Sequence, residues 1–497
     1  MRGIYRDLLK HSSVYGVGQI LSRLASFLLL PLYTRYLHRA DYGCIAILDL
    51  TTVVLAILIG GGMAQAVNRY HFDANNERER DQVWWSGLTF ILLVSLAFVI
   101  PAWYLRDYIA EWTLPGEANG SYYYSLVLPT LLLGMVAELP STYLRVQKWS
   151  GIFVSLSLGR LLLNIALNVY FLVYRGWGVA GVLTGNLICQ AVSSAILLGI
   201  LACTRGRYVF YSPIVRKLLI FASPLVLSAL LSTITQRANS YFLEYFCNRD
   251  DVGLYSLAFQ IGQGMNSFFI MPFASIWGVA IYEIAKQPNP KAVYVRVFNY
   301  FIYGLMLLMF GVSLFARPLL RIMATSEYEP AANLIPVICL AYVFFSMHDH
   351  FRIPVLLSKR TTTLLPAYFV AAFMSIVLNL SLIPLFGMAG AAWASVFAFM
   401  AFSFTGLWLY RRVDRYNYPL LRCGSVLAGM AISLLVCRGL DRVLNSFLLS
   451  FGLMTLVWLA WAVALFGRDG YRLLLIRFPS AQTGSLELGT PQTAQSS

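Results

Sequence analysis

Three arginines stand inside long apolar stretches of this sequence, away from its charged loops. They are Arg23, Arg160 and Arg237. A buried charge costs about 2.5 to 3.5 kcal/mol on insertion scales, so such residues indicate a function. Because the planar guanidinium donates two parallel hydrogen bonds to a phosphate, we predict that these arginines line a cavity that binds an anion. Alternatively, each arginine pairs with a carboxylate of a neighbouring helix, for instance Asp49.

A second group of titratable side chains has the chemistry to bind a cation or to relay a proton. Its members are Asp49, Glu138, Asp349, His348 and His350. Glu138 precedes Pro140, and Asp349 lies near Pro354. Proline frees backbone carbonyls and breaks a helix locally, so an acid beside it could bind a coupling ion, while the two histidines titrate near neutral pH. Alternatively, these residues hold helices together or lie at the rim of a water-filled vestibule.

The sequence lacks the patterns that are typical of catalysis and of metal or cofactor binding. Its seven cysteines are scattered without Cys-x-x-Cys spacing, which gives disulfide, zinc and nucleophile hypotheses little support. No histidine stands in an HExxH pattern, and neither a Walker A sequence nor a GxGxxG loop between a strand and a helix is present. We therefore expect a protein that is not an enzyme and that uses no cofactor and no metal.

The apolar stretches are long enough to cross a membrane. Of the 497 residues, 59% are apolar and 12% are charged, which is more apolar surface than one soluble core can bury. A bilayer core about 30 Å thick is crossed by a helix of roughly 20 apolar residues, and fourteen stretches are of this size. They are residues 12–36, 42–67, 83–105, 122–146, 151–174, 178–203, 218–245, 252–282, 294–316, 331–356, 362–385, 387–410, 420–440 and 444–466. They are too continuous for an outer-membrane barrel, and they predict an all-α integral membrane protein.

The two halves of the sequence are similar to each other. The segment RYLHRADYG, Arg35 to Gly43, aligns with YFCNRDDVG, Tyr245 to Gly253, and Glu138 aligns with Asp349. Because each copy holds six stretches, an even number, the copies are parallel and related by an axis along the membrane normal. Such halves enclose a central site and open to each side in turn. We predict two parallel six-helix bundles plus two C-terminal helices around a central cavity.

The distribution of charged residues indicates the topology. The predicted parts are an N-terminal six-helix bundle (1–204), a cytoplasmic linker (205–217), a C-terminal six-helix bundle (218–412), two additional transmembrane helices (413–466) and a polar cytoplasmic tail (467–497). With the N-terminus in the cytoplasm, the inside segments hold about 25 of the 37 Lys and Arg residues, as the positive-inside tendency requires. The net charge of +15 then reflects topology and contact with membrane lipids, and we expect no nucleic acid as a partner.

Several segments together carry a family resemblance. They are SRLASFLLLPLYTRYLHRADYG, GMAQAVNRYHF, and the pair LNVYFLVYRGWGVAGVLTGN and LNLSLIPLFGMAGAAWAS. The chain resembles the polysaccharide-export branch of the multidrug/oligosaccharidyl-lipid/polysaccharide exporter superfamily. The resemblance covers the first twelve stretches and implies a Wzx-type flippase of the bacterial cytoplasmic membrane. Such a flippase translocates undecaprenyl-diphosphate-linked oligosaccharide by alternating access, for the synthesis of O-antigen, capsule or exopolysaccharide.

The resemblance also implies roles and partners. Relatives in the superfamily bind the diphosphate with cationic cavity residues, a role that we carry over to Arg23 with the most weight and to Arg160 and Arg237 by location only. We expect a lipid-linked oligosaccharide as the substrate, a polysaccharide polymerase and other assembly proteins as partners, and a monomer.

Three other classes of protein are alternatives. A cation-coupled multidrug exporter of the same superfamily has a similar double bundle, but usually twelve spans and a less cationic cavity. A membrane-embedded glycosyltransferase or polymerase needs a large extramembrane loop with catalytic acids and bases, and the loops here are short. A major-facilitator transporter carries a basic signature after its second span, which the segment NRYHFDANNERERDQ lacks.

Overall fold

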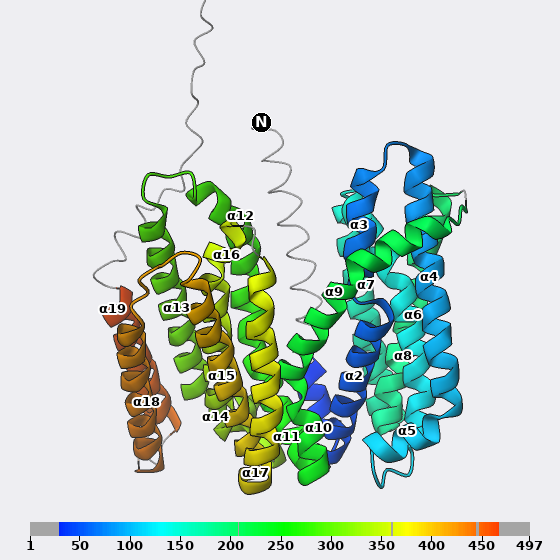
Figure 1. Ribbon diagram of the computed structural model, residues 1–497. Helices are drawn as coiled ribbons and strands as arrows, with labels where there is room; N and C mark the ends of the chain where they lie inside the picture. The colour runs from blue at the N-terminus through cyan, green and yellow to red at the C-terminus, as the bar shows by residue number, and fades with distance from the viewer. Residues whose placement is uncertain (1–28, 207, 359–360, 444–446, 467–497) are drawn as a thin grey trace, which may run out of the picture. The chain divides into compact units, whose positions relative to one another are not determined.

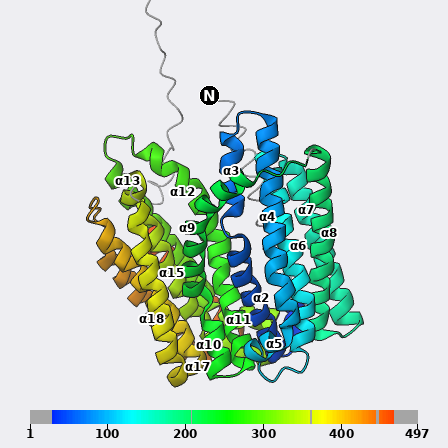
Figure 2. The same ribbon diagram turned by 45° about the vertical axis from the view of Figure 1, so that its right-hand side comes forward.

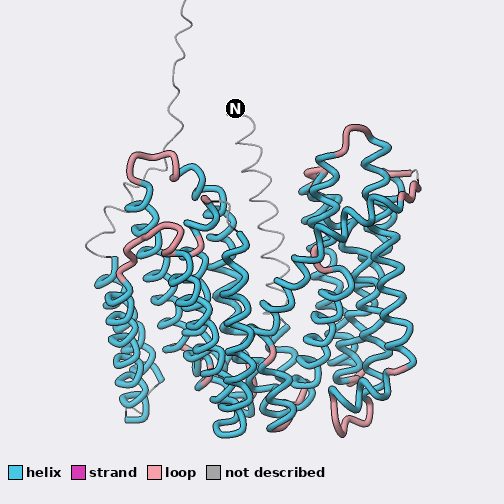
Figure 3. The backbone as a smooth tube through the Cα atoms, in the orientation of Figure 1, coloured by secondary structure: helices cyan, strands magenta, loops and turns pink. Residues whose placement is uncertain are grey.

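The computed structural model describes residues 29–206, 208–358, 361–443 and 447–466. Within these ranges the regular elements are helices, joined by short loops (Figure 3), and no strand occurs there. The all-α class that the apolar stretches predict is therefore confirmed. The first predicted stretch, residues 12–36, lies outside the described residues except for residues 29–36, which are helical.

The first half of the described chain is a bundle of long helices with one short helix between two of them. Its elements are α2 (Arg39–Gly60), α3 (Met63–Asp73), α4 (Glu77–Tyr104), α5 (Arg106–Thr113), α6 (Gly120–Val146), α7 (Ser150–Asn168), the π-helical turn η1 (Val169–Tyr174) and α8 (Gly178–Thr204). Helix α4 begins where the side chain of Asn76 accepts a hydrogen bond from the backbone N–H of Glu79 at 2.8 Å. This bond satisfies one of the donors that a helix N-terminus leaves free.

The second half repeats the plan with more interruptions. Its elements are α9 (Ser212–Arg237), α10 (Asn239–Phe246), α11 (Arg249–Met265), the π-helical turn η2 (Asn266–Ile270), α12 (Met271–Ile284), α13 (Pro290–Leu314), α14 (Ala316–Met323), the 3-10 helix η3 (Ser326–Asn333), α15 (Ile335–Phe351), α16 (Ile353–Leu357), the 3-10 helix η4 (Thr361–Leu364) and α17 (Leu365–Tyr410). Helix α11 has the same kind of N-cap as α4, because Asn248 accepts a hydrogen bond from the backbone N–H of Asp251 at 2.8 Å.

The number of membrane spans differs from the fourteen predicted stretches. Among the described residues, ten helices are long and apolar enough to cross a membrane, or eleven if the bent pair 326–333 and 335–357 is counted as one span. Helix α17 joins two predicted stretches into 46 residues, with a break at Gly387, whose φ of 55° lies in the left-handed region that favours glycine. The predicted stretch 252–282 is instead divided among α11, η2 and α12. The count of fourteen is therefore not confirmed.

Helix α9 connects the two halves. Figures 1 and 2 show it running obliquely, from a position beside α3 and α4 to the neighbourhood of α10. It packs against α2, α3 and α4 of the first half and against α17 of the second half. The linker predicted for residues 205–217 is helical from Ser212 onward. One continuous helix thus contacts both halves.

The duplicated segments cross each other in space. Helices α2 and α11, which begin with these segments, pack together. A Cβ atom on Gly43 would collide with the carbonyl oxygen of Arg249, and a Cβ atom on Gly253 would collide with the carbonyl oxygen of Arg39. The two glycines therefore allow a close approach that a side chain would prevent. The contact is reciprocal, as a pseudo-twofold relation between duplicated halves requires.

The described part of the chain divides into two compact units, with the boundary between Leu434 and Leu435. Helix α18 (Leu420–Val443) runs from the first unit into the second, and α19 (Phe447–Phe466) belongs to the second. Residues 449–466 of α19 have a mean hydropathy of 2.0, which suits a membrane span. The tail predicted for residues 467–497 lies outside the described residues.

Candidate functional site

A cavity of about 390 Å³ lies between the two halves of the first unit. From the first half it is lined by Leu29, Tyr33, Tyr42, Ile45, Ala46, Asp49, Leu50, Asn164, Val182 and Asn186. From the second half it is lined by Gln236, Arg237, Ser240, Tyr255, Ser256, Phe259, Gln260 and Gln263. Ligand sites are commonly apolar hollows with a few converging polar groups. Of the eighteen lining residues, five carry a side-chain amide and five carry a hydroxyl.

The charged lining residues are Asp49 from α2 and Arg237 from α9. The side chain of Asp49 is exposed, and that of Arg237 is half-buried. Within the described ranges no hydrogen bond joins the two side chains and no ion pair within 4.0 Å forms between them. The alternative in which an intramembrane arginine pairs directly with Asp49 is therefore not observed for Arg237. Because no described residue takes its donors, the Arg237 guanidinium is suited to a bound anionic group.

The cavity wall also holds the halves together. The hydroxyl of Tyr42 on α2 donates a hydrogen bond to the side-chain oxygen of Gln260 on α11. Nearby, the hydroxyls of Thr51 on α2 and Tyr241 on α10 lie 2.6 Å apart. Polar groups that form hydrogen bonds across an apolar boundary fix the register of the surfaces that they join. The cavity thus lies beside a polar seam between the halves.

The structure places the three predicted cations differently. Arg237 lines the cavity. Arg160 lies on the exposed side of α7, where its guanidinium donates a hydrogen bond to the side-chain oxygen of Gln190 on α8 at 2.8 Å. Arg160 is not among the cavity-lining residues, but it lies one helical turn from Asn164, which lines the cavity. Arg23 lies outside the described residues, and its role stays a prediction.

The predicted coupling carboxylates other than Asp49 lie outside this lining. Glu138 on α6 is half-buried, and its carboxylate would lie 4.0 Å from a Cβ atom on Gly60 of α2. Asp349 on α15 forms an ion pair with Arg352 at 2.9 Å. The two residues occupy matching places in their halves, but neither is among the described residues around the cavity. Their role in coupling stays a prediction.

The histidines that flank Asp349 are enclosed by aromatic rings. A ring nitrogen of His348 lies 2.9 Å from the hydroxyl of Tyr410, and the ring stacks on Phe402 at 3.8 Å. His350 is completely buried, with the ring of Phe301 at 5.1 Å. In the described part of the chain, neither ring nitrogen of His350 has a hydrogen-bond partner. The aromatic surroundings show both histidines packed in the second half, and their part in proton relay stays a prediction.

Sequence reasoning missed an ion-pair cluster between the halves. Arg249, at the start of α11, contacts Glu117 of the loop before α6 at 2.6 Å and Glu244 of α10 at 2.8 Å. Its guanidinium also donates a hydrogen bond to the carbonyl of Pro115 at 2.6 Å. The duplication itself carried a signal, since Arg249 belongs to the repeated segment that begins α11. Glu117, its partner in the loop, lies outside the repeated segments and carries no such signal.

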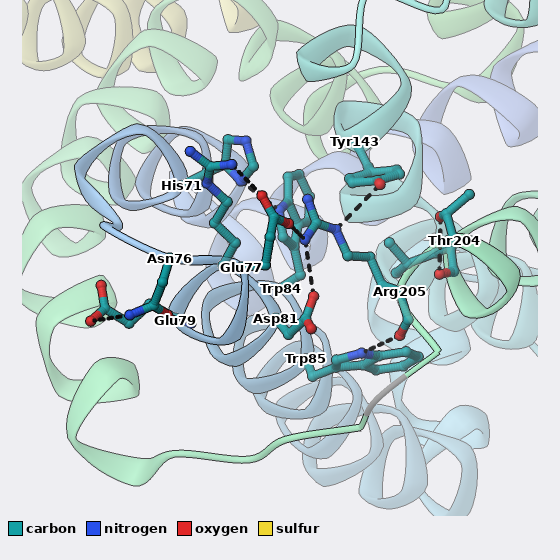
Figure 4. A network of polar contacts seen from close by, with 12 residues as sticks. His71, Asn76, Glu77, Glu79, Asp81, Trp84, Trp85, Tyr143, Thr204 and Arg205 are labelled. Carbon is teal, nitrogen blue, oxygen red and sulfur yellow. Dashed lines mark hydrogen bonds and ion pairs between the residues drawn. The ribbon is translucent and has the colours of Figure 1, made fainter.

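A second cluster fastens the start of the linker to the first half, as Figure 4 shows. Arg205, which follows α8, contacts Glu77 at 2.5 Å and Asp81 at 3.0 Å, both on α4. Its guanidinium also donates a hydrogen bond to the hydroxyl of Tyr143 on α6 at 3.2 Å. The indole of Trp85 donates to the backbone carbonyl of Arg205 at 2.9 Å. The linker is therefore attached to the first half where it begins.

Comparison with known sequences matches more than half of this chain to a described family. The family model for polysaccharide biosynthesis proteins matches residues 8–277. A protein of the Lsg locus of Haemophilus influenzae is 22% identical to this chain over 290 residues, which are 56% of this chain and 67% of that protein. The match spans the first half and the helices of the second half that line the cavity.

Comparison with solved structures shows the fold. The lipid II flippase MurJ in an inward closed conformation matches with a TM-score of 0.74 and 15% identity, over 94% of this chain and all of that chain. An inward-facing multidrug resistance transporter of the MATE family, from the MOP superfamily, matches with a TM-score of 0.65 and 16% identity, over 80% of this chain and 94% of that one. A MOP superfamily transporter from Pyrococcus furiosus has a TM-score of 0.55 at 13% identity, over 82% of this chain and 96% of that one. The predicted all-α membrane fold is therefore one that solved transporters share, and the bounds of the two six-helix bundles stay a prediction.

Proposed function

This chain belongs to the polysaccharide biosynthesis protein family, and we propose that it is a flippase that moves a diphosphate-linked oligosaccharide on a prenyl lipid across the cytoplasmic membrane. The family membership confirms the resemblance to the polysaccharide-export branch and points to a transporter. Translocation needs a polar path for the headgroup while the prenyl chain stays in lipid. It requires no bond to be broken.

The observation that carries this proposal is Arg237 in the cavity between the halves, which forms no ion pair with any described carboxylate. A guanidinium without a carboxylate partner is suited to an anion, and its fork fits two phosphate oxygens. A diphosphate carries about two negative charges, and each is worth about 2.3 kcal/mol per 100 mV of membrane potential. With a negative cell interior, outward movement is favoured by roughly 4 to 5 kcal/mol. The protein therefore has to supply a path more than a driving force.

The contacts between the halves support alternating access. The crossing of Gly43 and Gly253, together with the ion pairs of Arg249, joins the halves at the end where α2 and α11 begin. The topology expected from the loop charges places this end outside the cell. In the proposed cycle these contacts separate to release the headgroup outward, and other proteins of the assembly pathway, among them a polymerase, supply and polymerise the repeat units.

Substitution of Arg237 tests the anion site. We expect Arg237→Ala to reduce flipping about tenfold or more, since losing a hydrogen bond to a charged group is worth about 1.5 to 3 kcal/mol, and Arg237→Lys to retain part of the activity. The measurement is accumulation of lipid-linked oligosaccharide in cells that lack their own flippase. The matched control is Arg216→Ala, an exposed arginine of the same helix. Full export by Arg237→Ala would remove the anion-site assignment.

Cation-coupled export of drug-like molecules is the second candidate, because Asp49 presents an exposed carboxylate to the same cavity. A carboxylate attracts organic cations, and the lining then has one charge of each sign. The two functions differ in a direct assay. Cells that express the chain would lower their accumulation of a fluorescent organic cation if it exports drugs, and Asp49→Asn would abolish that effect. A flippase leaves dye accumulation unchanged.

A further inference from the structure

Two polar pairs repeat at one-turn spacing along the contact between α7 and α8. Asn164 donates a hydrogen bond to the side-chain oxygen of Asn186 at 3.0 Å. One turn away, Arg160 donates to the side-chain oxygen of Gln190 at 2.8 Å. Residues four apart share one face of a helix, and four residues advance about 6 Å along its axis. These four residues, which we call the α7–α8 ladder, therefore form a continuous polar strip.

The ladder begins inside the cavity and leads out of it. Asn164 and Asn186 line the cavity, and Arg160 lies on the exposed surface beyond them. The direction is toward the N-terminal end of α7, which the loop charges place at the cytoplasm. A headgroup that is bound at Arg237 and extends toward the cytoplasm would meet this strip first with its sugars.

Arg160 is positioned by neutral groups and keeps its positive charge. Gln190, which accepts its hydrogen bond, is buried and donates from its own amide nitrogen to the hydroxyl of Ser194 at 3.1 Å. Ser194 in turn donates to the carbonyl of Leu133 on α6 at 2.9 Å. In the described part of the chain no carboxylate lies within 4.0 Å of the Arg160 guanidinium. The amide thus fixes the guanidinium without neutralising it, which leaves the charge for an anionic ligand.

The asparagine pair has the chemistry that sugars require. Each amide offers two N–H donors and an acceptor oxygen, so the bond between Asn164 and Asn186 uses only part of their capacity. Asn164 is also held through its backbone, because its carbonyl accepts a hydrogen bond from the Asn168 side chain at 2.8 Å. The hydroxyl of Tyr33 donates to the side-chain oxygen of Asn168 at 3.0 Å. Positioned donors and acceptors of this kind match sugar hydroxyls.

We propose that the α7–α8 ladder is a subsite for an acidic sugar of the oligosaccharide. Asn164 and Asn186 bind the hydroxyls of the sugar units, and Arg160 binds the carboxylate of a uronic acid or a similar acidic unit. This inference rests on the proposed flippase function, in which Arg237 binds the diphosphate. It divides the recognition of the substrate between two arginines that the sequence alone does not distinguish.

Two matched substrates test this subsite. Purified full-length protein is placed in vesicles with a prenyl-diphosphate disaccharide whose outer unit is either glucose or glucuronic acid. Periodate added outside then reports the initial rate at which the sugar reaches the outer leaflet. We expect the wild-type protein to flip the acidic substrate about tenfold or more faster. Arg160→Gln should remove this preference by slowing only the acidic substrate, and Arg160→Lys should restore part of it.

The asparagines and a control complete the experiment. Asn164→Leu and Asn186→Leu should slow both disaccharides severalfold, but not a prenyl diphosphate without sugars, which is followed with a membrane-impermeant phosphatase. Arg216→Gln should change no rate. Equal slowing of both disaccharides by Arg160→Gln would overturn the proposal. With an unchanged melting temperature, Arg160 would then serve the diphosphate. A wild-type protein that flips both disaccharides at the same rate would also overturn the proposal.

The same rates separate this inference from the proposed function. Arg237→Ala should slow all three lipids alike if that residue binds the diphosphate. If it does so while Arg160→Gln leaves the acidic preference intact, the subsite fails and the flippase remains. If no prenyl diphosphate is flipped by the wild-type protein, the proposed function fails. A merely structural role of Arg160 would lower the melting temperature and affect both disaccharides equally.

Discussion

Among the acidic residues of the spans, Asp49 differs from Asp349 in what surrounds its carboxylate. Asp49 is exposed to the cavity without a direct ion pair in the described residues, whereas Asp349 is paired with Arg352 at 2.9 Å. A carboxylate that binds and releases a coupling ion must be accessible, and a carboxylate that an arginine already neutralises is poorly suited to this task. At the scale of single residues, the cavity therefore favours Asp49 for coupling over the proline-adjacent acids.

We expect Asp49→Asn to change how flipping depends on a proton or sodium gradient. The neutral amide keeps the shape of the side chain but loses the charge that binds a cation. The comparison variant is Asp349→Asn, which should leave the gradient dependence unchanged and reduce thermal stability, because it leaves Arg352 without its partner. Flipping rates in vesicles with and without imposed gradients are the measurement. If Asp349→Asn changes the gradient dependence and Asp49→Asn does not, Asp349 of α15 is the coupling residue instead.

Some site residues could be predicted from the sequence, and others could not. Arg237 stands out because it is a charge in an apolar stretch, and such a charge needs a cavity or a partner. Gln190 carries no comparable signal, since uncharged amides in membrane helices more often join helices than bind ligands. Its link to Arg160 depends on how α8 faces α7, which requires coordinates. The sequence therefore indicates both the charges and the amides of these spans, but it does not show which amides position a charge and which line the cavity.

At the scale of helices, α2 and α11 contact each other through the duplicated segments with which both helices begin. The aligned segments revealed that both helices begin alike, with Gly43 and Gly253 at matching positions. That they also meet was not predictable, because an alignment of a sequence with itself relates positions without giving distances. The structure adds that each glycine faces the backbone of the other copy.

Replacing Gly43 by alanine tests this crossing. The added methyl group collides with the backbone of Arg249, which cannot move aside as a flexible side chain does. We expect a loss of about 1 to 3 kcal/mol of stability, as for other overpacked contacts, seen as a lower unfolding temperature in detergent. Gly199→Ala is the control, because no atom lies within 4 Å of a Cβ atom at that exposed position of α8. Equal effects of the two substitutions would show that the crossing is not tight.

At the scale of the first unit, the contacts between the halves define one state of a transport cycle. A rocking motion must break the Arg249 cluster and the glycine crossing together, since both lie where α2 and α11 begin. The attachment of Arg205 to α4 and α6 joins the linker to the first half. Relative movement is therefore expected after the linker, along α9. The sequence predicts two halves that move against each other. It does not predict where the hinge lies, because that follows from the contacts of α9 with both halves.

Cys44 reports whether this end opens. It follows Gly43 in α2 and is 1% exposed, so a membrane-impermeant maleimide reaches it only when the halves separate. Glu117→Gln removes one carboxylate from Arg249, whose side chain is 14% exposed against 25% for Glu117. If the pair contributes about 1 kcal/mol, the labelling rate of Cys44 should rise roughly fivefold. Exposed Cys203 and buried Cys339 are internal controls whose labelling should stay the same. An unchanged rate at Cys44 would mean that the ion pair does not hold this end closed, and a rise at Cys339 as well would indicate general loosening of the fold.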